Sequence, residues 1–152
     1  MYVGGLSIRT RADEKVFKNG DMLFGYTSSF RMGQLLRYSL VIPEQSRRKD
    51  DYRYMCTDFI GAVINLFENK KFAKTSNGEI SGGTFLVGYK GNLYSVENDS
   101  QVAVPALNSE AVGCGVGIAL GALHALHNNK MKPRDRIIKT LEAATEFSAG
   151  VR

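Results

Sequence analysis

The stretch EKVFKNGDMLFGYTSS, Glu14 to Ser29, decides how the fold begins. Asn19-Gly20 joins two short apolar runs, and this dipeptide is a strong hairpin signal because both residue types tolerate positive φ. The pattern predicts strands over 15–18 and 22–27. Ser28 and Ser29 then offer N-caps for a helix over 30–40, whose apolar side chains share one face.

The rest of the chain continues with helices and strands in pairs. We expect a second helix over 52–67, capped by Asp50 or Asp51, and then a flexible polar loop over 74–83. Strands over 84–89 and 92–98 turn at Lys90-Gly91, with short strand candidates at 101–104 and 110–112. Two helices close the chain. The last of them opens at Pro133, and its predicted buried face consists of Ile137, Ile138, Leu141, Ala144 and Phe147.

This order of elements predicts one α+β domain over residues 1–152, packed as a layered sandwich. The chain is 43% hydrophobic and 23% charged, with a net charge of +5, as in ordinary globular proteins. It shows no membrane-length apolar run and no signal-peptide pattern, so we expect a cytoplasmic protein without a membrane partner. The basic triplet Arg47, Arg48 and Lys49 is typical of a solvated loop, and nothing indicates nucleic-acid binding.

A glycine-rich corner, AVGCGVGIALGAL from Ala111 to Leu123, has three interpretations. A phosphate loop is disfavoured because the Lys-Ser/Thr pair of a P-loop is missing. A thiol nucleophile at Cys114 gains from the helix that starts just after it, but His124 and His127 lie two to three turns away and point elsewhere. The favoured interpretation is a structural corner in which glycines permit unusual backbone angles and close approach.

The remaining candidates for chemistry are weaker. His124 and His127 are spaced as metal ligands can be, but an exposed helix surface explains them better, and no metal or cofactor is expected. Cys56 lies in a strong helical pattern and is expected to pack as a buried thiol. A disulfide between Cys56 and Cys114 is left open, although a reducing compartment argues against it.

Four stretches together resemble the proteasome β-subunit family, and most of all the HslV-type peptidase subunit with its small bacterial or phage relatives. They are YVGG near the start, EKVFKNGDMLFGYTSS, GTFLVGYKGNLYSVEND and AVGCGVGIALGAL. The resemblance implies the N-terminal-nucleophile (Ntn) hydrolase fold, a four-layer α-β-β-α sandwich of antiparallel sheets. It also implies a threonine peptidase whose free α-amine and a nearby lysine activate the threonine hydroxyl.

The resemblance also assigns site residues on this chain. Lys15 falls on the lysine position, and Cys114 with Gly115 falls on the Ser-Gly that lies beside the nucleophile. Thr27 and Ser28 fall where substrate would bind. The chain departs from the pattern near its start: no Thr stands at position 1, and Gly-Gly-Asp reads Gly4-Gly5-Leu6.

This departure leads us to expect that the family's first strand and nucleophile are missing from the printed chain. Three explanations compete. The gene product is longer than this sequence, or the chain is a non-catalytic relative that keeps the fold, or preceding residues are left out of the numbering. The strand from Tyr2 onward is then expected to be poorly paired, or paired by a partner chain.

The resulting expectation is a proteasome-like or HslV-like peptidase subunit that is catalytically impaired as given. The alternative is a scaffold or ligand-binding protein on the same fold, which would hold a peptide or small ligand in a cleft near Lys15, Thr27 and Cys114. By analogy with the family, we expect a homo-oligomer, either a ring or a dimer, and an ATP-driven unfoldase as a further partner.

Overall fold

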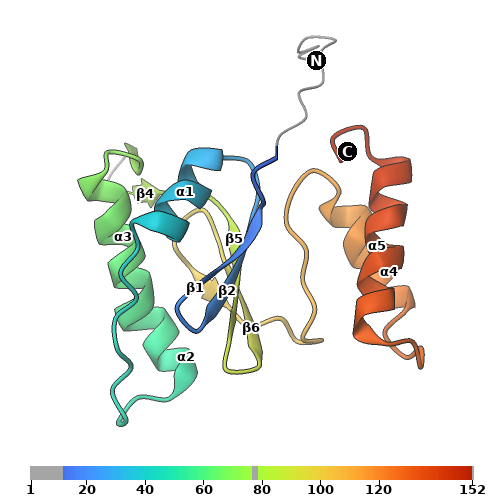
Figure 1. Cartoon of the computed structure of the whole chain (residues 1–152), viewed down its shortest axis with the longest axis horizontal. Coiled ribbons are helices and arrows are strands. Elements are labelled where there is room, and N and C mark those ends of the chain that lie inside the picture. The colour runs from blue at the N-terminus through green and yellow to red at the C-terminus, as the bar shows by residue number, and fades with distance from the viewer. Residues whose placement is uncertain (1–11, 77–78, 152) are drawn as a thin grey trace.

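The computed structural model describes residues 12–76 and 79–151 (Figure 1). The strands are β1 (Val16–Asn19), β2 (Met22–Tyr26), β3 (Lys74–Ser76), β4 (Glu79–Ser81), β5 (Phe85–Tyr89), β6 (Asn92–Val96) and β7 (Val102–Ala103). The helices are α1 (Phe30–Tyr38), α2 (Asp51–Tyr54), the π-helix η1 (Met55–Phe59), α3 (Ile60–Asn69), α4 (Val116–Ala125) and α5 (Pro133–Phe147). The strand expected from Tyr2 onward, and the prediction about its pairing, lie outside the described residues.

Five of the strands form one antiparallel sheet in the order β1-β2-β5-β6-β7, and β3 pairs with β4 in a separate hairpin. Because side chains alternate along a strand, one sheet face carries the aromatic and aliphatic residues that pack against α1, η1 and α3. Figure 1 shows α1 to α3 on this side of the sheet and α4 with α5 on the other side. The predicted α+β class, with antiparallel sheet between helices, is confirmed.

The first hairpin turns one residue later than predicted. Asn19 pairs with Met22, so Gly20 and Asp21 form the turn, and of the residues in this hairpin only Gly20 has a positive φ, of 55°. Asn19 remains in β1, where its side-chain amide donates hydrogen bonds to the carbonyls of Leu36 and Leu40, at 2.9 and 3.0 Å. These bonds satisfy the Leu36 carbonyl in the last turn of α1, which the helix itself leaves without a partner, and the Leu40 carbonyl just after the helix.

Two further predictions about strands are wrong. Residues 74–83 are not a plain loop, because β3 and β4 pair there through their backbones. The Asn77-Gly78 dipeptide between them is the same hairpin signal as in the first hairpin. Residues 110–112 form no strand. By contrast, Lys90 and Gly91 turn the β5–β6 hairpin as predicted, with positive φ at both positions.

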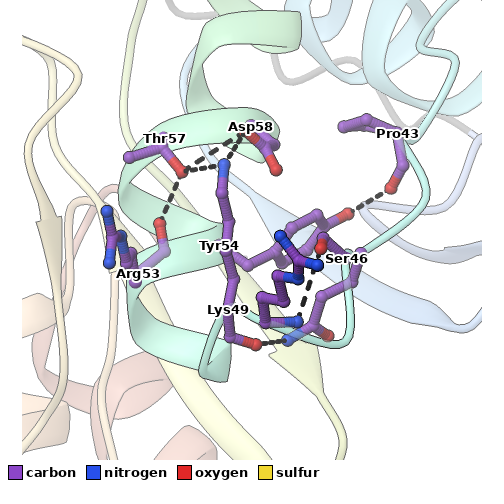
Figure 2. Close-up of polar contacts among 9 residues, drawn as sticks. Pro43, Ser46, Lys49, Arg53, Tyr54, Thr57 and Asp58 are labelled. Carbon is purple, nitrogen blue, oxygen red and sulfur yellow. Dashed lines mark hydrogen bonds and ion pairs between the residues drawn. The ribbon is translucent and has the colours of Figure 1, made fainter.

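The predicted helix over 52–67 is a continuous helical segment with a π-helical turn, η1, in its middle. Asp50 caps its start by accepting a hydrogen bond from the Arg53 amide at 2.9 Å. Figure 2 shows how the preceding loop is tied to this segment: Lys49 Nζ lies 2.6 Å from Asp58 Oδ1, and the Tyr54 hydroxyl donates to the Pro43 carbonyl at 2.6 Å. Loop and helix therefore hold each other in place.

The predicted buried face of the last helix is wrong except at Ala144. Ile137, Ile138, Leu141 and Phe147 are exposed, whereas Thr140 and Ala144 are buried. The reason is that α5 packs mainly on α4, and the close contact between the two helices falls on small side chains. This reversal leaves an apolar surface on α5.

Candidate functional site

The link between β2 and α1 begins the candidate site. β2 ends at Tyr26 and α1 starts at Phe30, so Thr27 and Ser28 stand at one end of the sheet. Lys15 lies at the same end, because the Tyr26 amide donates a hydrogen bond to the Lys15 carbonyl at 3.1 Å. The fold therefore places the predicted lysine, just before β1, and the two predicted substrate-binding residues, just after β2, at the same end of two neighbouring strands.

Ser28 has an unusual backbone conformation, with a φ of 60°. Its hydroxyl donates to the Thr27 carbonyl at 2.7 Å, and the Ser29 amide donates to the same oxygen at 2.8 Å. A non-glycine residue in the left-handed region costs about 1–3 kcal/mol, and such residues occur at functional sites as well as in turns, as Lys90 does here. Ser29, and not Ser28, caps α1, since its hydroxyl accepts from the Met32 amide at 3.3 Å.

The glycine-rich corner approaches this link from the far end of the sequence. Gly113 has a φ of 116°, and a Cβ built on it would lie 3.0 Å from Thr27 Oγ1. Close approach and positive φ both require glycine here. The interpretation as a structural corner therefore holds at Gly113, and the corner lies directly beside Thr27.

Cys114 and Gly115 both lie against the C-terminal segment 148–151. Cys114 is exposed, and a Cβ on Gly150 would lie 3.1 Å from its sulfur. Gly115 is buried and precedes α4, where a Cβ would lie 2.7 Å from a Val151 methyl group. Gly115 thus serves packing between the start of α4 and the end of the chain. Gly117 has no such constraint, since nothing lies within 4 Å of its built Cβ.

Lys15 is exposed, and its ammonium group lies 5.3 Å from the centre of the Phe30 ring. A cation over an aromatic face is held by the ring quadrupole, so this contact keeps the positive charge near the start of α1. Sequence reasoning missed Phe30 as the residue that positions Lys15. The only signal would have been an aromatic residue at the first position of the helix after the Thr27–Ser29 link.

The remaining sequence candidates do not join this site. Both cysteines are free, with Cys56 half-buried beside the core and not fully buried as expected. His124 and His127 are exposed at the end of α4. Within residues 12–76 and 79–151, no group of three His, Cys, Asp or Glu side chains is arranged as a metal site. The helices of this part of the chain are all too short or too polar to cross a membrane.

Comparisons with solved structures find the same fold in proteasome-like and HslV-like proteins. The Thiobacillus denitrificans protein BPH superposes with a TM-score of 0.71 and 22% identity, covering 91% of this chain and 74% of BPH. BPH in complex with epoxomicin gives the same TM-score and coverage at 19% identity. HslV from Trypanosoma brucei gives 0.60 and 16%, covering 91% and 75%. The sequence matches no protein-family model and no curated protein.

These structures define the class of fold: the chain has the α+β fold of BPH and HslV. Sequence identities below 25% establish a shared fold but not a shared activity. The chemistry of this chain must therefore be argued from its own site.

Proposed function

We propose that this chain is a proteasome-like peptidase subunit, a threonine-type Ntn hydrolase by descent, and that it binds peptide without cutting it. The observation that carries the proposal is the approach of Gly113 to Thr27 Oγ1, which brings two loops distant in sequence together at one end of the sheet. Sites assembled from loops on a rigid scaffold are typical of binding and catalysis.

In this proposal Lys15 supplies the positive charge of the catalytic centre, and Cys114 with Gly115 forms the corner beside the reacting group. Thr27 and Ser28 hold the substrate backbone. The left-handed Ser28 and the exposed thiol and ammonium groups support these roles. Catalytic impairment is supported by what the side chains do: Ser28 Oγ donates to a backbone carbonyl, and Lys15 Nζ lies over an aromatic ring. Neither group activates a nucleophile among the described residues.

The approach of Gly113 to Thr27 also favours the second candidate, a ligand-binding protein on this fold. In that case a peptide forms hydrogen bonds with this end of the sheet, and no covalent step follows. Assembly into a ring or dimer, work with an ATP-driven unfoldase and a cytoplasmic location are further parts of the proposal, taken by analogy with the fold class.

Epoxomicin, which BPH binds, provides a probe that separates binding from catalysis. We expect it to raise the melting temperature of the full chain without adding mass to it, and we expect no cleavage of fluorogenic peptides. Lys15→Ala and Thr27→Val should each reduce the thermal shift, because they remove the charge and the hydroxyl at the binding end. Lys18→Ala is the matched control, as Lys18 is exposed on β1.

Covalent labelling and cleavage that Lys15→Ala lowers by about 100-fold or more would show an active Ntn peptidase in place of an impaired one. Intact mass and N-terminal sequencing of the natural product would then identify its nucleophile. If the Lys15→Ala variant still cleaves peptides, that result would contradict the mechanism implied by the fold class, in which Lys15 is required. If epoxomicin and peptides leave the melting temperature unchanged, the peptide-binding site itself is wrong.

A further inference from the structure

β1 is an edge strand of the five-stranded sheet, because β2 pairs with one side of it and none of the described strands pairs with the other. The hydrogen bond from the Tyr26 amide to the Lys15 carbonyl fixes which backbone groups of this strand face β2. Hydrogen-bonded positions alternate along an antiparallel pair, so Phe17 also turns its N–H and C=O toward β2. The N–H and C=O of Val16 and Lys18 therefore point outward. Outward groups of this kind can pair with a further strand.

A small cavity opens beside this edge, between β1 and α1. Its buried side is formed by Phe17, Tyr26 and Gly33, and its volume is about 100 Å³. Sites for whole small molecules have volumes of roughly 300–1,000 Å³, so this cavity has the size of a single side chain. In an antiparallel strand added to β1, the residue opposite Phe17 would lie on the same sheet face as Phe17. Its side chain would therefore point to the cavity.

Arg37 supplies a positive charge in this cavity. The centre of its guanidinium group lies 5.6 Å from the centre of the Phe17 ring and 5.3 Å from that of Tyr38. Cation–π attraction to the two rings keeps the group in place. Among the described residues, Arg37 pairs with Glu14 at 3.9 Å, and the Glu14 side chain is 72% exposed, so this pair contributes little to stability. A carboxylate that enters the cavity can accept two parallel hydrogen bonds and is the stronger partner.

The charges along the edge favour an acidic strand. Lys15 and Lys18 are exposed on and just before β1, and Asp13 and Glu14 are exposed further upstream. With Arg37, three positive groups face two negative ones, so a basic strand would meet more repulsion than an acidic one. Glu14 competes with an entering carboxylate for Arg37, and its exposed side chain can turn toward the solvent.

We propose that an extended acidic segment of a partner protein adds to β1 as a further antiparallel strand, with one Asp or Glu side chain placed in the cavity against Arg37. The two residues that flank this side chain exchange backbone hydrogen bonds with Val16 and Lys18. Their own side chains lie on the other sheet face, where Val16 is 57% exposed. Backbone pairing supplies affinity in such strand addition, and the cavity supplies specificity. The site is separate from the approach of Gly113 to Thr27 and depends on no peptidase activity.

Fluorescence polarisation with short peptides tests the strand addition on the full chain. The probe is the pentapeptide Thr-Val-Glu-Val-Thr, with an uncharged fluorophore at its N-terminus and an amide at its C-terminus, so that Glu carries its only carboxylate. We expect this probe to bind, and the same peptide with Lys in place of Glu to bind at least about tenfold more weakly.

N-methylated forms of the probe show whether the peptide pairs as a strand. N-methylation of either valine removes an N–H that donates to β1 and should abolish binding. N-methylation of the Glu residue is the matched control. Its N–H points away from β1 in the proposed register, so binding should persist.

Variants of the chain test the edge and the cavity separately. Lys18→Pro removes an outward N–H without touching the bonds to β2, so the chain should fold and lose the probe. Arg37→Gln should weaken binding about tenfold or more, and Arg37→Glu should prefer the Lys peptide to the Glu peptide. Glu14→Gln should strengthen binding of the probe, because Arg37 loses its competing partner. Arg31→Gln, at an exposed position of α1 outside the cavity, is the matched control and should bind like the wild type.

A wild type that does not bind the probe would overturn the proposal, as would equal loss of binding on N-methylation of valine and of Glu. Unchanged affinity in Arg37→Gln, or in a folded Lys18→Pro, would overturn it as well. If circular dichroism shows that Lys18→Pro does not fold, the N-methylated peptides decide. A wild-type dimer that Lys18→Pro dissociates would show that a second copy occupies the edge, and the proposal would be wrong.

Thr27→Val separates this inference from the proposed function. The variant should bind the Glu peptide like the wild type even where it loses epoxomicin. If Thr27→Val abolishes binding of the Glu peptide, the peptide lies at the Thr27 end of the sheet and the β1 edge is not its site.

Discussion

At the scale of single residues, Tyr54 shows how burial creates a pH-dependent contribution to stability. Its side chain is 1% exposed, and its hydroxyl donates to the Pro43 carbonyl at 2.6 Å. Burial raises the pKa of Tyr54 to about 12, and the negative charges of Tyr89 and Asp58 act in the same direction. The sequence placed Tyr54 in a helix, but it did not indicate that a loop carbonyl would lie within reach of the hydroxyl.

The sign of the pH effect follows from the raised pKa. Below pH 10 the phenol is neutral in both states, so its full contribution is present. As the pH rises from 10 to about 12, the unfolded chain ionises first, and the free energy of unfolding falls. We predict that Tyr54→Phe is less stable by about 1–3 kcal/mol at neutral pH, because the Pro43 carbonyl loses its donor.

Between pH 10 and 12, Tyr54→Phe should show a smaller decline than the wild type, as measured by urea unfolding at several pH values. Tyr38→Phe, at an exposed tyrosine, provides the control and should follow the wild-type slope. A decline in Tyr54→Phe as steep as in the wild type would contradict the assignment.

At the scale of elements, α1 packs on β2 at a point where no side chain fits. A Cβ on Gly33 would lie 2.2 Å from a carbon of the Tyr26 ring. That ring is itself held by Phe30, 5.9 Å away in an edge-to-face contact, and by Phe17 at 6.2 Å. The helical periodicity predicted which side of α1 is buried, and Met32, Leu35, Leu36 and Leu40 are buried as expected. The closeness of the contact required the tertiary structure.

Replacing glycine by alanine at two helical positions should therefore have opposite effects. We predict that Gly33→Ala destabilises the protein by about 1–3 kcal/mol, because the ring must move within a packed core. Gly61→Ala in α3 should stabilise it by about 0.5–1 kcal/mol, because nothing lies within 4 Å of the added Cβ and alanine favours the helix. Chemical denaturation of both variants measures the difference. Equal stabilities would mean that α1 does not sit this close to β2.

At the scale of the whole molecule, burial is uneven between the two helix layers. The core joins the sheet to α1, η1 and α3, whereas α4 and α5 together bury only Ala119, Thr140 and Ala144. Local stability follows the number of buried contacts, so the α4–α5 pair should open more readily than the sheet. How strongly the amides of α4 and α5 are protected from hydrogen exchange also depends on whether anything covers the exposed side of α5.

Hydrogen exchange followed by mass spectrometry measures this difference. We predict that amides of α4 and α5 exchange faster than those of β2 and β5 in dilute protein. Protection of α5 equal to that of the sheet in dilute protein would contradict the uneven burial.

The sequence by itself determined the order of elements, most of the turns and the apolar faces of the first helices, because these depend on local backbone preference and on periodicity. It also held a signal for the β3–β4 hairpin in Asn77-Gly78, but the polar residues around this dipeptide lack the apolar pattern of a strand, and the hairpin was missed. The tertiary structure alone decided that Gly113 reaches Thr27 and that α5 shows its large side chains to the outside. Both features depend on which surfaces meet after the chain has folded. The sequence pattern of one element does not show which other element will pack against it.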